Sequence, residues 1–103
     1  MALIKRVEFK TEIQRRNRIQ VPRLIRWEFR MEPSQILMVR VHFEGDWESR
    51  QKFYTHMSKD GRIYIPKLAC RLLREANQNQ SIVGVLVEVE LCPSEGVLDE
   101  EDE

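Results

Sequence analysis

One pattern of hydrophobic and polar positions occurs twice along the chain, at a spacing of 44 residues. Residues typical of strands alternate with polar ones at Phe9, Thr11 and Ile13, and again at Phe53, Thr55 and Met57. Alternation of this kind predicts a strand with one face buried and the other in solvent. We therefore expect each half of the chain to begin with such a strand.

A turn and a second strand follow in each half, and a proline ends that strand. Residues 15–21 (Arg-Arg-Asn-Arg-Ile-Gln-Val) overlie residues 59–65 (Lys-Asp-Gly-Arg-Ile-Tyr-Ile). Asn and Gly accept the positive backbone angles of a tight hairpin turn. Pro22 and Pro66 then stop the strand, because proline lacks the N–H that a sheet needs but suits the first turn of a helix.

After each proline the apolar positions change period. In the second half they line one helical face: Leu68, Ala69, Leu72, Leu73 and Ala76. In the first half, residues 24–31 fit either a short helix or a strand, and the repeat favours the helix. Each half then closes with a β-rich run, at 36–43 and 82–91, where the offset grows to 48 so that Val39 meets Val87.

The repeat predicts how the chain is organised. We expect a mainly β fold with two short helices, in which two β-β-α-β repeats, about 7–43 and 51–91, form one closed pseudo-twofold β-barrel. Neither repeat alone could cover its apolar surfaces, so the two must interlock. The segment 44–50 is too short for a flexible domain linker and is expected to be a connecting loop. Residues 1–94 then make a single domain.

Charge is unevenly distributed along a chain whose formal net charge is zero. Residues 1–43 hold ten basic and four acidic side chains, residues 44–94 balance, and residues 95–103 carry six carboxylates and no base. The last segment is expected to be a disordered acidic tail that competes for the basic surface. The folded part is therefore basic, which favours an anionic partner without proving one.

The remaining sequence features argue against several classes of protein. No run approaches 18 apolar residues, and Cys70 and Cys92 stand without CxxC spacing, so we expect two reduced thiols and a cytoplasmic protein. His42 and His56 have no nucleophile motif beside them, and there is no Gly-rich phosphate loop or zinc-ligand spacing. We expect no catalytic residues, no metal and no cofactor, hence no enzyme.

The repeated unit resembles a known family. Arg18-Ile19-Gln20-Val21-Pro22 opens a run to Val39 that is similar to the pattern G-R-I-x-I-P-x-x-[IL]-R-x-x-L-x-I-x-P-G-D-x-[LV]-x-V of AbrB-like transition-state regulators. Asp60-Gly61-Arg62-Ile63-Tyr64-Ile65-Pro66 matches the opening better but has no later Pro-Gly-Asp. The resemblance implies a cradle-loop barrel related to RIFT and double-psi barrels. A tandem copy implies a monomer with pseudo-twofold symmetry, with a dimer left open.

The resemblance also implies duplex-DNA binding, as in a transcriptional regulator or nucleoid-associated protein. The arginines that match the family's contact positions or add to its first turn are Arg15, Arg16, Arg18, Arg26, Arg62 and Arg71. Cys70 replaces the helix arginine of the second half and Trp27 a basic position of the first, so the binding face is expected to be lopsided. Arginines on a two-stranded turn suit phosphate because they supply paired donors and positive charge.

Other functions stay open at this point. Fold transfers better than function, and a RIFT-like barrel that acts as a protein- or RNA-binding adaptor, or as a small-ligand binder, fits the same residues. An adaptor would expose an apolar patch, and a ligand binder would hold a concave apolar pocket. Trp27 and Trp47 could stack on bases, but core or loop packing is the more common role for such residues.

Overall fold

The order of elements repeats as expected from the sequence. The computed structural model describes residues 5–94. The first repeat holds the strands β1 (Val7–Glu12), β2 (Arg18–Gln20) and β3 (Leu37–Phe43), with the helix α1 (Arg23–Glu28) before β3. The second holds β4 (Asp46–Thr55), β5 (Arg62–Tyr64), α2 (Lys67–Ala76) and β6 (Leu86–Pro93). The fold is mainly β with two helices, and α1 confirms the helical prediction for the first half.

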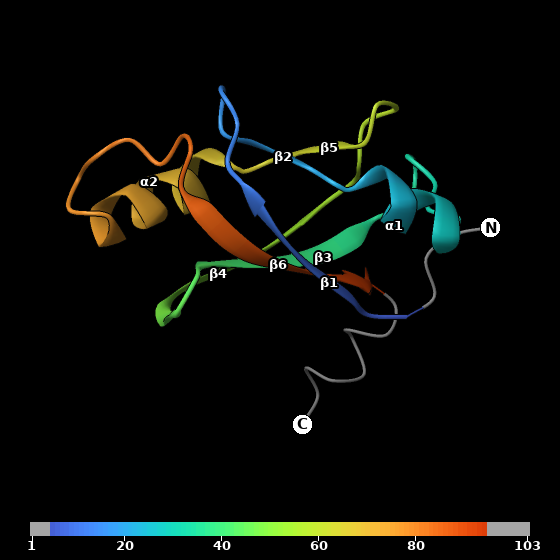
Figure 1. The fold of residues 1–103 in the computed structure, drawn as a ribbon, viewed down its shortest axis with the longest axis horizontal. Coiled ribbons are helices and arrows are strands. Elements are labelled where there is room, and N and C mark those ends of the chain that lie inside the picture. Colours follow the sequence, from blue (N-terminus) through green and yellow to red (C-terminus); the bar gives the residue numbers. More distant parts are fainter. Residues whose placement is uncertain (1–4, 95–103) are drawn as a thin grey trace.

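The strands form two antiparallel sheets. Four strands pair in the order β1-β6-β3-β4, and β2 pairs with β5 in a separate two-stranded ribbon. Figure 1 shows this ribbon lying across one side of the four-stranded sheet, with α1 and α2 at opposite ends of the molecule. Each ladder between two strands in residues 5–94 joins one repeat to the other, so each repeat depends on the other for its strand partners.

The pairing registers correct one detail of the repeat. Phe9 pairs with Val89, and its counterpart Phe53 pairs with Val39, so Val39 takes the place of Val89. The offset over these strands is therefore 50 residues and not 48. Both values are even and leave the same side chains facing inward, so hydrophobic alternation cannot distinguish them. The ribbon keeps the offset of 44, because Ile19 pairs with Ile63.

The core lies between the ribbon and the sheet. The ribbon contributes Ile19 and Ile63, and the sheet contributes Leu37, Val87 and Leu91, all with no exposed side-chain surface. Alternate residues of each strand point away from this core, as the pleat requires. Chemistry on the ribbon is thereby confined to its outer face.

The predicted connecting loop at 44–50 is wrong. Only Glu44 and Gly45 form a turn, and β4 begins at Asp46, so β3 and β4 are a hairpin. The Ser49 hydroxyl accepts a hydrogen bond from the Phe43 amide (2.8 Å) and donates one to the Asp46 carbonyl (2.8 Å). This buried bridge holds a run of polar residues in a strand that their side chains alone do not favour.

Two sequence expectations fall partly outside this description. The acidic tail at 95–103 lies outside the described residues. Within residues 5–94, no helix has the length and apolar composition that crossing a membrane requires.

Candidate nucleic-acid interface

The outer face of the ribbon is polar and carries two of the predicted arginines. Arg18 pairs with Tyr64 across the strands, and Gln20 pairs with Arg62. The Arg18 guanidinium lies over the Tyr64 ring at 5.8 Å from its centre. Because Ile19 and Ile63 face the core between them, all four polar side chains lie on the same outer surface.

The turn after β1 brings Arg16 and Asn17 to α2 of the other repeat, and Arg15 lies in the same turn. The Ile65 amide, just before α2, donates a hydrogen bond to the Asn17 carbonyl (3.0 Å). Arg16, Lys67, Arg71 and Arg74 therefore line a common hollow of about 650 Å³. The basic turn of the first repeat and the basic helix of the second thus form a single surface.

The corresponding turn of the second repeat reaches α1. The Val21 amide donates to the Gly61 carbonyl (2.8 Å), which matches the contact at Asn17 after a shift of 44 residues. The Arg26 Nε donates to the Val21 carbonyl (3.2 Å). One donor of Arg26 is therefore used inside the protein, and this side chain differs from the exposed arginines of the other turn.

Arg62 is also partly engaged. Its Nη1 lies 2.8 Å from the Asp60 carboxylate, and its Nε is buried without a hydrogen-bond partner among the described residues. The Asp60 pKa is lowered from its usual value, first by a hydrogen bond from Ser58 and then by a backbone hydrogen bond, with smaller effects of Arg62 and Arg18. A carboxylate that stays ionised beside Arg62 reduces the positive charge at this end of the ribbon.

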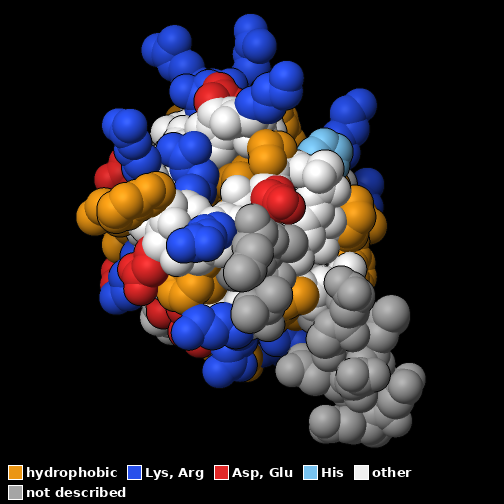
Figure 2. Space-filling view, turned by 90° about the vertical axis from the view of Figure 1, so that its right-hand side faces the viewer, with side chains coloured by type: hydrophobic (Ala, Val, Ile, Leu, Met, Phe, Trp, Pro, Cys, Tyr) orange, Lys and Arg blue, Asp and Glu red, His pale blue; other side chains and the backbone are white. Residues whose placement is uncertain are grey.

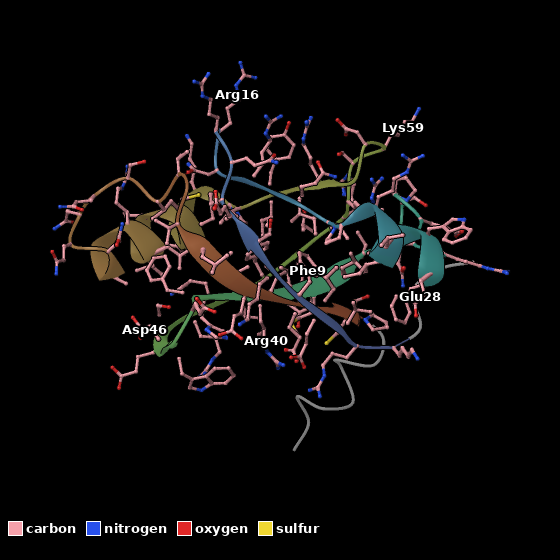
Figure 3. All side chains as sticks on the ribbon, in the orientation of Figure 1. Phe9, Arg16, Glu28, Arg40, Asp46 and Lys59 are labelled. Carbon is pink, nitrogen blue, oxygen red and sulfur yellow. The ribbon has the colours of Figure 1, made fainter. Side chains whose placement is uncertain are left out.

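The two ends of the ribbon face therefore differ in charge. In Figure 3, Arg16 and Lys59 mark the tips of the two turns on the same side of the molecule. Figure 2, which looks at the α1 end, shows lysines and arginines crowding the upper, ribbon side. Within residues 5–94, no ion pair involves Arg15, Arg16, Arg71 or Arg74. Both ends of the ribbon face are therefore basic, but within the described residues an arginine is paired with a carboxylate at the α1 end, Arg62 with Asp60, and not among these four at the α2 end.

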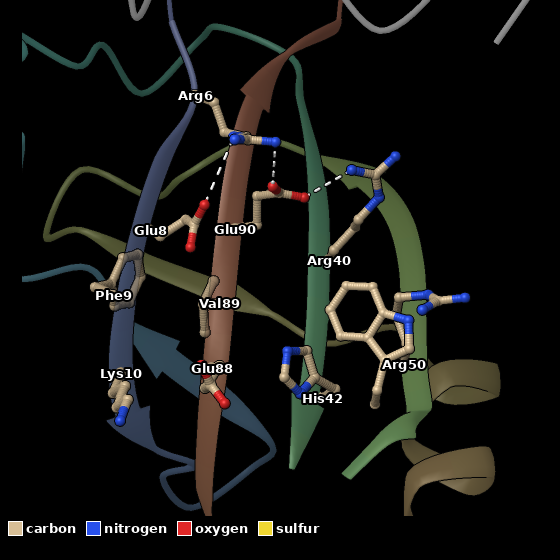
Figure 4. A pocket seen from close by; sticks show the side chains of 11 residues that line it. Arg6, Glu8, Phe9, Lys10, Arg40, His42, Arg50, Glu88, Val89 and Glu90 are labelled. Carbon is tan, nitrogen blue, oxygen red and sulfur yellow. Dashed lines mark hydrogen bonds and ion pairs between the residues drawn. The ribbon is translucent and has the colours of Figure 1, made fainter. Parts of the chain in front are cut away.

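The opposite surface, the outer face of the four-stranded sheet, carries mixed charge. Figure 4 shows its hollow of about 390 Å³, in which Glu90 joins Arg40 (2.7 Å) and Arg6 (3.2 Å). Lys10 is paired with Glu44 (2.8 Å) and its pKa is raised, mainly by that hydrogen bond. Since carboxylates alternate with bases here, this face has little net attraction for a polyanion.

Sequence reasoning missed Lys67 and Arg74, and of the two packing roles expected for the tryptophans, a place in the core is wrong. Arg74 follows Arg71 by three residues, a spacing that puts both on one side of a helix and was available from the sequence. The role of Lys67 could not be predicted from the sequence, because it depends on the packing of the 15–17 turn against the helix of the other repeat. Trp27 is 79% exposed and Trp47 63%, so neither belongs to the core. Trp47 stacks on Arg50 (4.3 Å) and contacts His42, on the sheet side.

Comparison with known proteins supports the fold and gives no information on function. No protein-family model matches the chain, and no curated protein does. The chain is similar to a solved structure titled "The solution structure of PHS018 from pyrococcus horikoshii" with a TM-score of 0.66. The sequences are 23% identical, and the match covers 90% of this chain and 94% of that one. At this identity the likeness establishes a shared fold over nearly the whole chain.

Proposed function

We propose that this protein binds nucleic acid, with duplex DNA as the first candidate, through the ribbon face. The observation that carries the proposal is the junction of Arg16 with Arg71 and Arg74 around one hollow, with Arg15 beside Arg16 in the same turn. These four exposed guanidinium groups come from two repeats and have no carboxylate partner within residues 5–94. Guanidinium groups bind phosphate through paired donors, and backbone phosphates supply most of the affinity of such proteins. The proposal assigns no catalysis and no cofactor.

We also infer that the two sheets together form one closed pseudo-twofold barrel of the cradle-loop type, as the AbrB-like resemblance implies. Three contacts support closure at one corner. Ile13 donates to Val85 (3.0 Å), Gly84 donates to Ile13 (2.7 Å), and Gln14 bridges to Arg18, which links β1 to β2. On this proposal one cytoplasmic chain forms the twofold body that AbrB-like proteins build from two chains.

The test is a fluorescence-anisotropy titration of a labelled DNA duplex and a matched RNA duplex at about 50 and 200 mM salt. The wild type is compared with Arg15→Ala/Arg16→Ala/Arg18→Ala. We expect duplex-DNA binding that weakens steeply with salt, by roughly 0.9 log units per log unit of salt for each phosphate contacted. In the triple variant the affinity should fall at least about tenfold, and the salt slope should become shallower.

A matched control removes the same charge from the other face. Lys10→Ala/Arg50→Ala/Lys52→Ala also lowers the net charge by three but alters only the sheet side. It should keep most of the affinity. Equal losses in both triple variants would mean that binding follows net charge and not this face, and no salt-sensitive binding to either duplex would refute the proposal.

A protein-binding adaptor is the second candidate, favoured by one observation on α1. Leu24 and Trp27 are three residues apart on this helix and both are strongly exposed. Adjacent exposed apolar side chains are typical of a contact surface. Trp27→Ala should leave DNA affinity unchanged if this end serves a protein partner, because the charged α2 end lies on the other side of the molecule (Figure 1).

A further inference from the structure

The two ends of the ribbon have the same backbone arrangement but differ in the side chain at one helix position. At one end the Arg26 Nε donates to the Val21 carbonyl (3.2 Å), and at the other the Cys70 Sγ donates to the Ile65 carbonyl (3.3 Å). Arg26 and Cys70 are 44 residues apart, as are Val21 and Ile65. The same helix position makes the same contact to the same carbonyl, with a long side chain in one repeat and a short one in the other.

The turn that packs against this helix position also differs between the two repeats. A β-carbon on Gly61 would meet the Arg26 guanidinium carbon at 2.5 Å, so the arginine lies directly on the glycine backbone. The counterpart of Gly61 is Asn17, which has a β-carbon and holds φ at +55°. An arginine at position 70 in the Arg26 conformation would collide with Asn17. The second repeat therefore leaves open the space that the first repeat fills.

This open space is what separates α2 from the 15–17 turn. It consists of the hollow of about 650 Å³ already described and an adjoining one of about 410 Å³. Both are lined by Arg16, Asn17, Cys70 and Arg74. Sites for small ligands commonly measure about 300–1,000 Å³, so the space suits a molecule the size of a mononucleotide.

The lining combines positive charge with apolar surface. Arg16, Arg71 and Arg74 surround the opening, whereas Ile65 and Ile82 supply buried apolar walls. Burial raises the pKa of the Cys70 thiol, while the Arg74 charge opposes that rise. The floor is thus a neutral thiol at physiological pH and offers no negative charge against an anion.

We propose that this hollow, the Cys70 hollow, binds a small phosphorylated molecule. Its phosphate is held by Arg16, Arg71 and Arg74, and its organic part lies against Ile65 and Ile82. Several guanidinium groups match a phosphate monoester, whose charge and acceptor oxygens exceed those of a single carboxylate. The site goes beyond the proposed function, because it takes a free ligand and does not require nucleic-acid binding.

The test uses adenosine 5′-monophosphate as the probe, with inorganic phosphate and adenosine as its two halves. Each is titrated into isotope-labelled protein at constant ionic strength while backbone amide resonances are followed. We expect saturable shifts at Asn17, Cys70 and Ile82 with the nucleotide, a weaker response with phosphate and least with adenosine. Failure of the nucleotide to saturate by about 10 mM, or an equal response to adenosine, would overturn the proposal.

A variant that transplants the first repeat's arrangement tests the cavity apart from the charge. Cys70→Arg/Asn17→Gly fills the hollow as Arg26 covers Gly61, and it adds a positive charge. Nucleotide affinity should fall at least tenfold although electrostatic attraction has grown. Undiminished affinity would show that charge alone attracts the nucleotide and that the Cys70 hollow is not its site.

A second variant serves if the transplant does not fold. Arg71→Gln/Arg74→Gln alters two exposed side chains and should weaken nucleotide binding at least tenfold. Its matched control is Arg23→Gln/Arg30→Gln on the α1 side, which removes equal charge and should change the affinity less than twofold. Equal effects of the two pairs would contradict the site.

The transplant Cys70→Arg/Asn17→Gly separates this inference from the proposed function, whereas Arg71→Gln/Arg74→Gln is expected to weaken both kinds of binding. The transplant keeps every arginine of the ribbon face and adds one, so its duplex-DNA affinity should not fall below that of the wild type. Nucleotide binding without any DNA binding supports the Cys70 hollow and refutes the nucleic-acid proposal. DNA binding without nucleotide binding supports the nucleic-acid proposal and refutes the Cys70 hollow as a ligand site.

Discussion

Gly61 is a residue at which the two repeats approach each other closely. Its φ of +84° lies in the region that disfavours L side chains, and the Arg26 guanidinium carbon lies 2.5 Å from the position of a β-carbon, too near for both. The sequence predicted the turn, since Asp-Gly is typical of one. It did not predict the contact with Arg26, because that depends on which helix the turn reaches.

Gly61→Ala should destabilise the protein through its positive φ and, to a smaller extent, because the flexible Arg26 side chain must move away from its hydrogen bond with the Val21 carbonyl. We expect a loss of about 1–3 kcal/mol in the free energy of unfolding, measured by chemical denaturation. Gly45→Ala is the control, since Gly45 also has positive φ but has nothing within 4 Å of its β-carbon position. It should cost less. If Gly61→Ala costs as much in an Arg26→Ala background as in the wild type, the close approach is not part of the cause.

Cys70 gives the protein a dependence on alkaline pH. Because burial raises its pKa above that of the unfolded chain, the folded state favours the protonated thiol. The resulting stability is fully present below the unfolded pKa, about 8.5, and is lost as pH rises through the folded pKa. Thermal unfolding from pH 7 to 10 should therefore show a smaller decline for Cys70→Ala than for the wild type, and parallel declines would contradict this.

At the scale of elements, the β3–β4 hairpin shows where hydrophobic patterning is insufficient. The strands of the core followed from alternation, but β4 starts in a polar stretch, Asp46–Arg50, which has the composition of a loop. Its conformation is set by pairing with β3 and by the buried Ser49 hydroxyl. Tertiary context decides such segments, because a polar edge strand satisfies its backbone through its neighbour.

Ser49→Ala should therefore destabilise the hairpin. The substitution removes the acceptor of the Phe43 amide and leaves a buried N–H without its partner, which costs about 1–3 kcal/mol. Ser81→Ala is the control, because the Ser81 hydroxyl also accepts from a backbone amide but at an exposed site (3.2 Å). Chemical denaturation of both variants checks the difference, and equal losses would refute the role of burial.

The candidate interface also becomes clear only between elements. The arginines of the 15–18 turn were identifiable as an anion-binding motif from the sequence. Their meeting with Arg71, Arg74 and Lys67 of α2 was not, because the turn packs on the helix of the other repeat. Residue types were predictable, but their grouping depended on the interlocked topology.

At the scale of the whole molecule, each of the four ladders between strands joins the two repeats, and only the isolated Gln14–Arg18 bridge among the described residues lies within one repeat. The internal repeat, its helices and most of its strands were predictable, since each has a strong local pattern. The offset of 50 was not, because registers differing by two bury the same face.

Neither repeat should therefore fold by itself as a monomer. We expect fragments 1–44 and 45–103 each to give an amide spectrum without dispersion, because each lacks the strands that its own strands pair with. An equimolar mixture should recover dispersed resonances. A folded monomeric half, established by its spectrum and by light scattering, would contradict the interlocked topology.

The difference between Arg26 at one end and Cys70 at the other breaks the twofold symmetry of the molecule. A body with true twofold symmetry looks the same after half a turn, so an elongated partner can dock on it in two equivalent ways. Here one end is filled and the other is open and basic, and half a turn exchanges unlike surfaces. A single chain that carries both repeats can therefore tell the head of a bound partner from its tail, which a symmetric pair of identical chains cannot do.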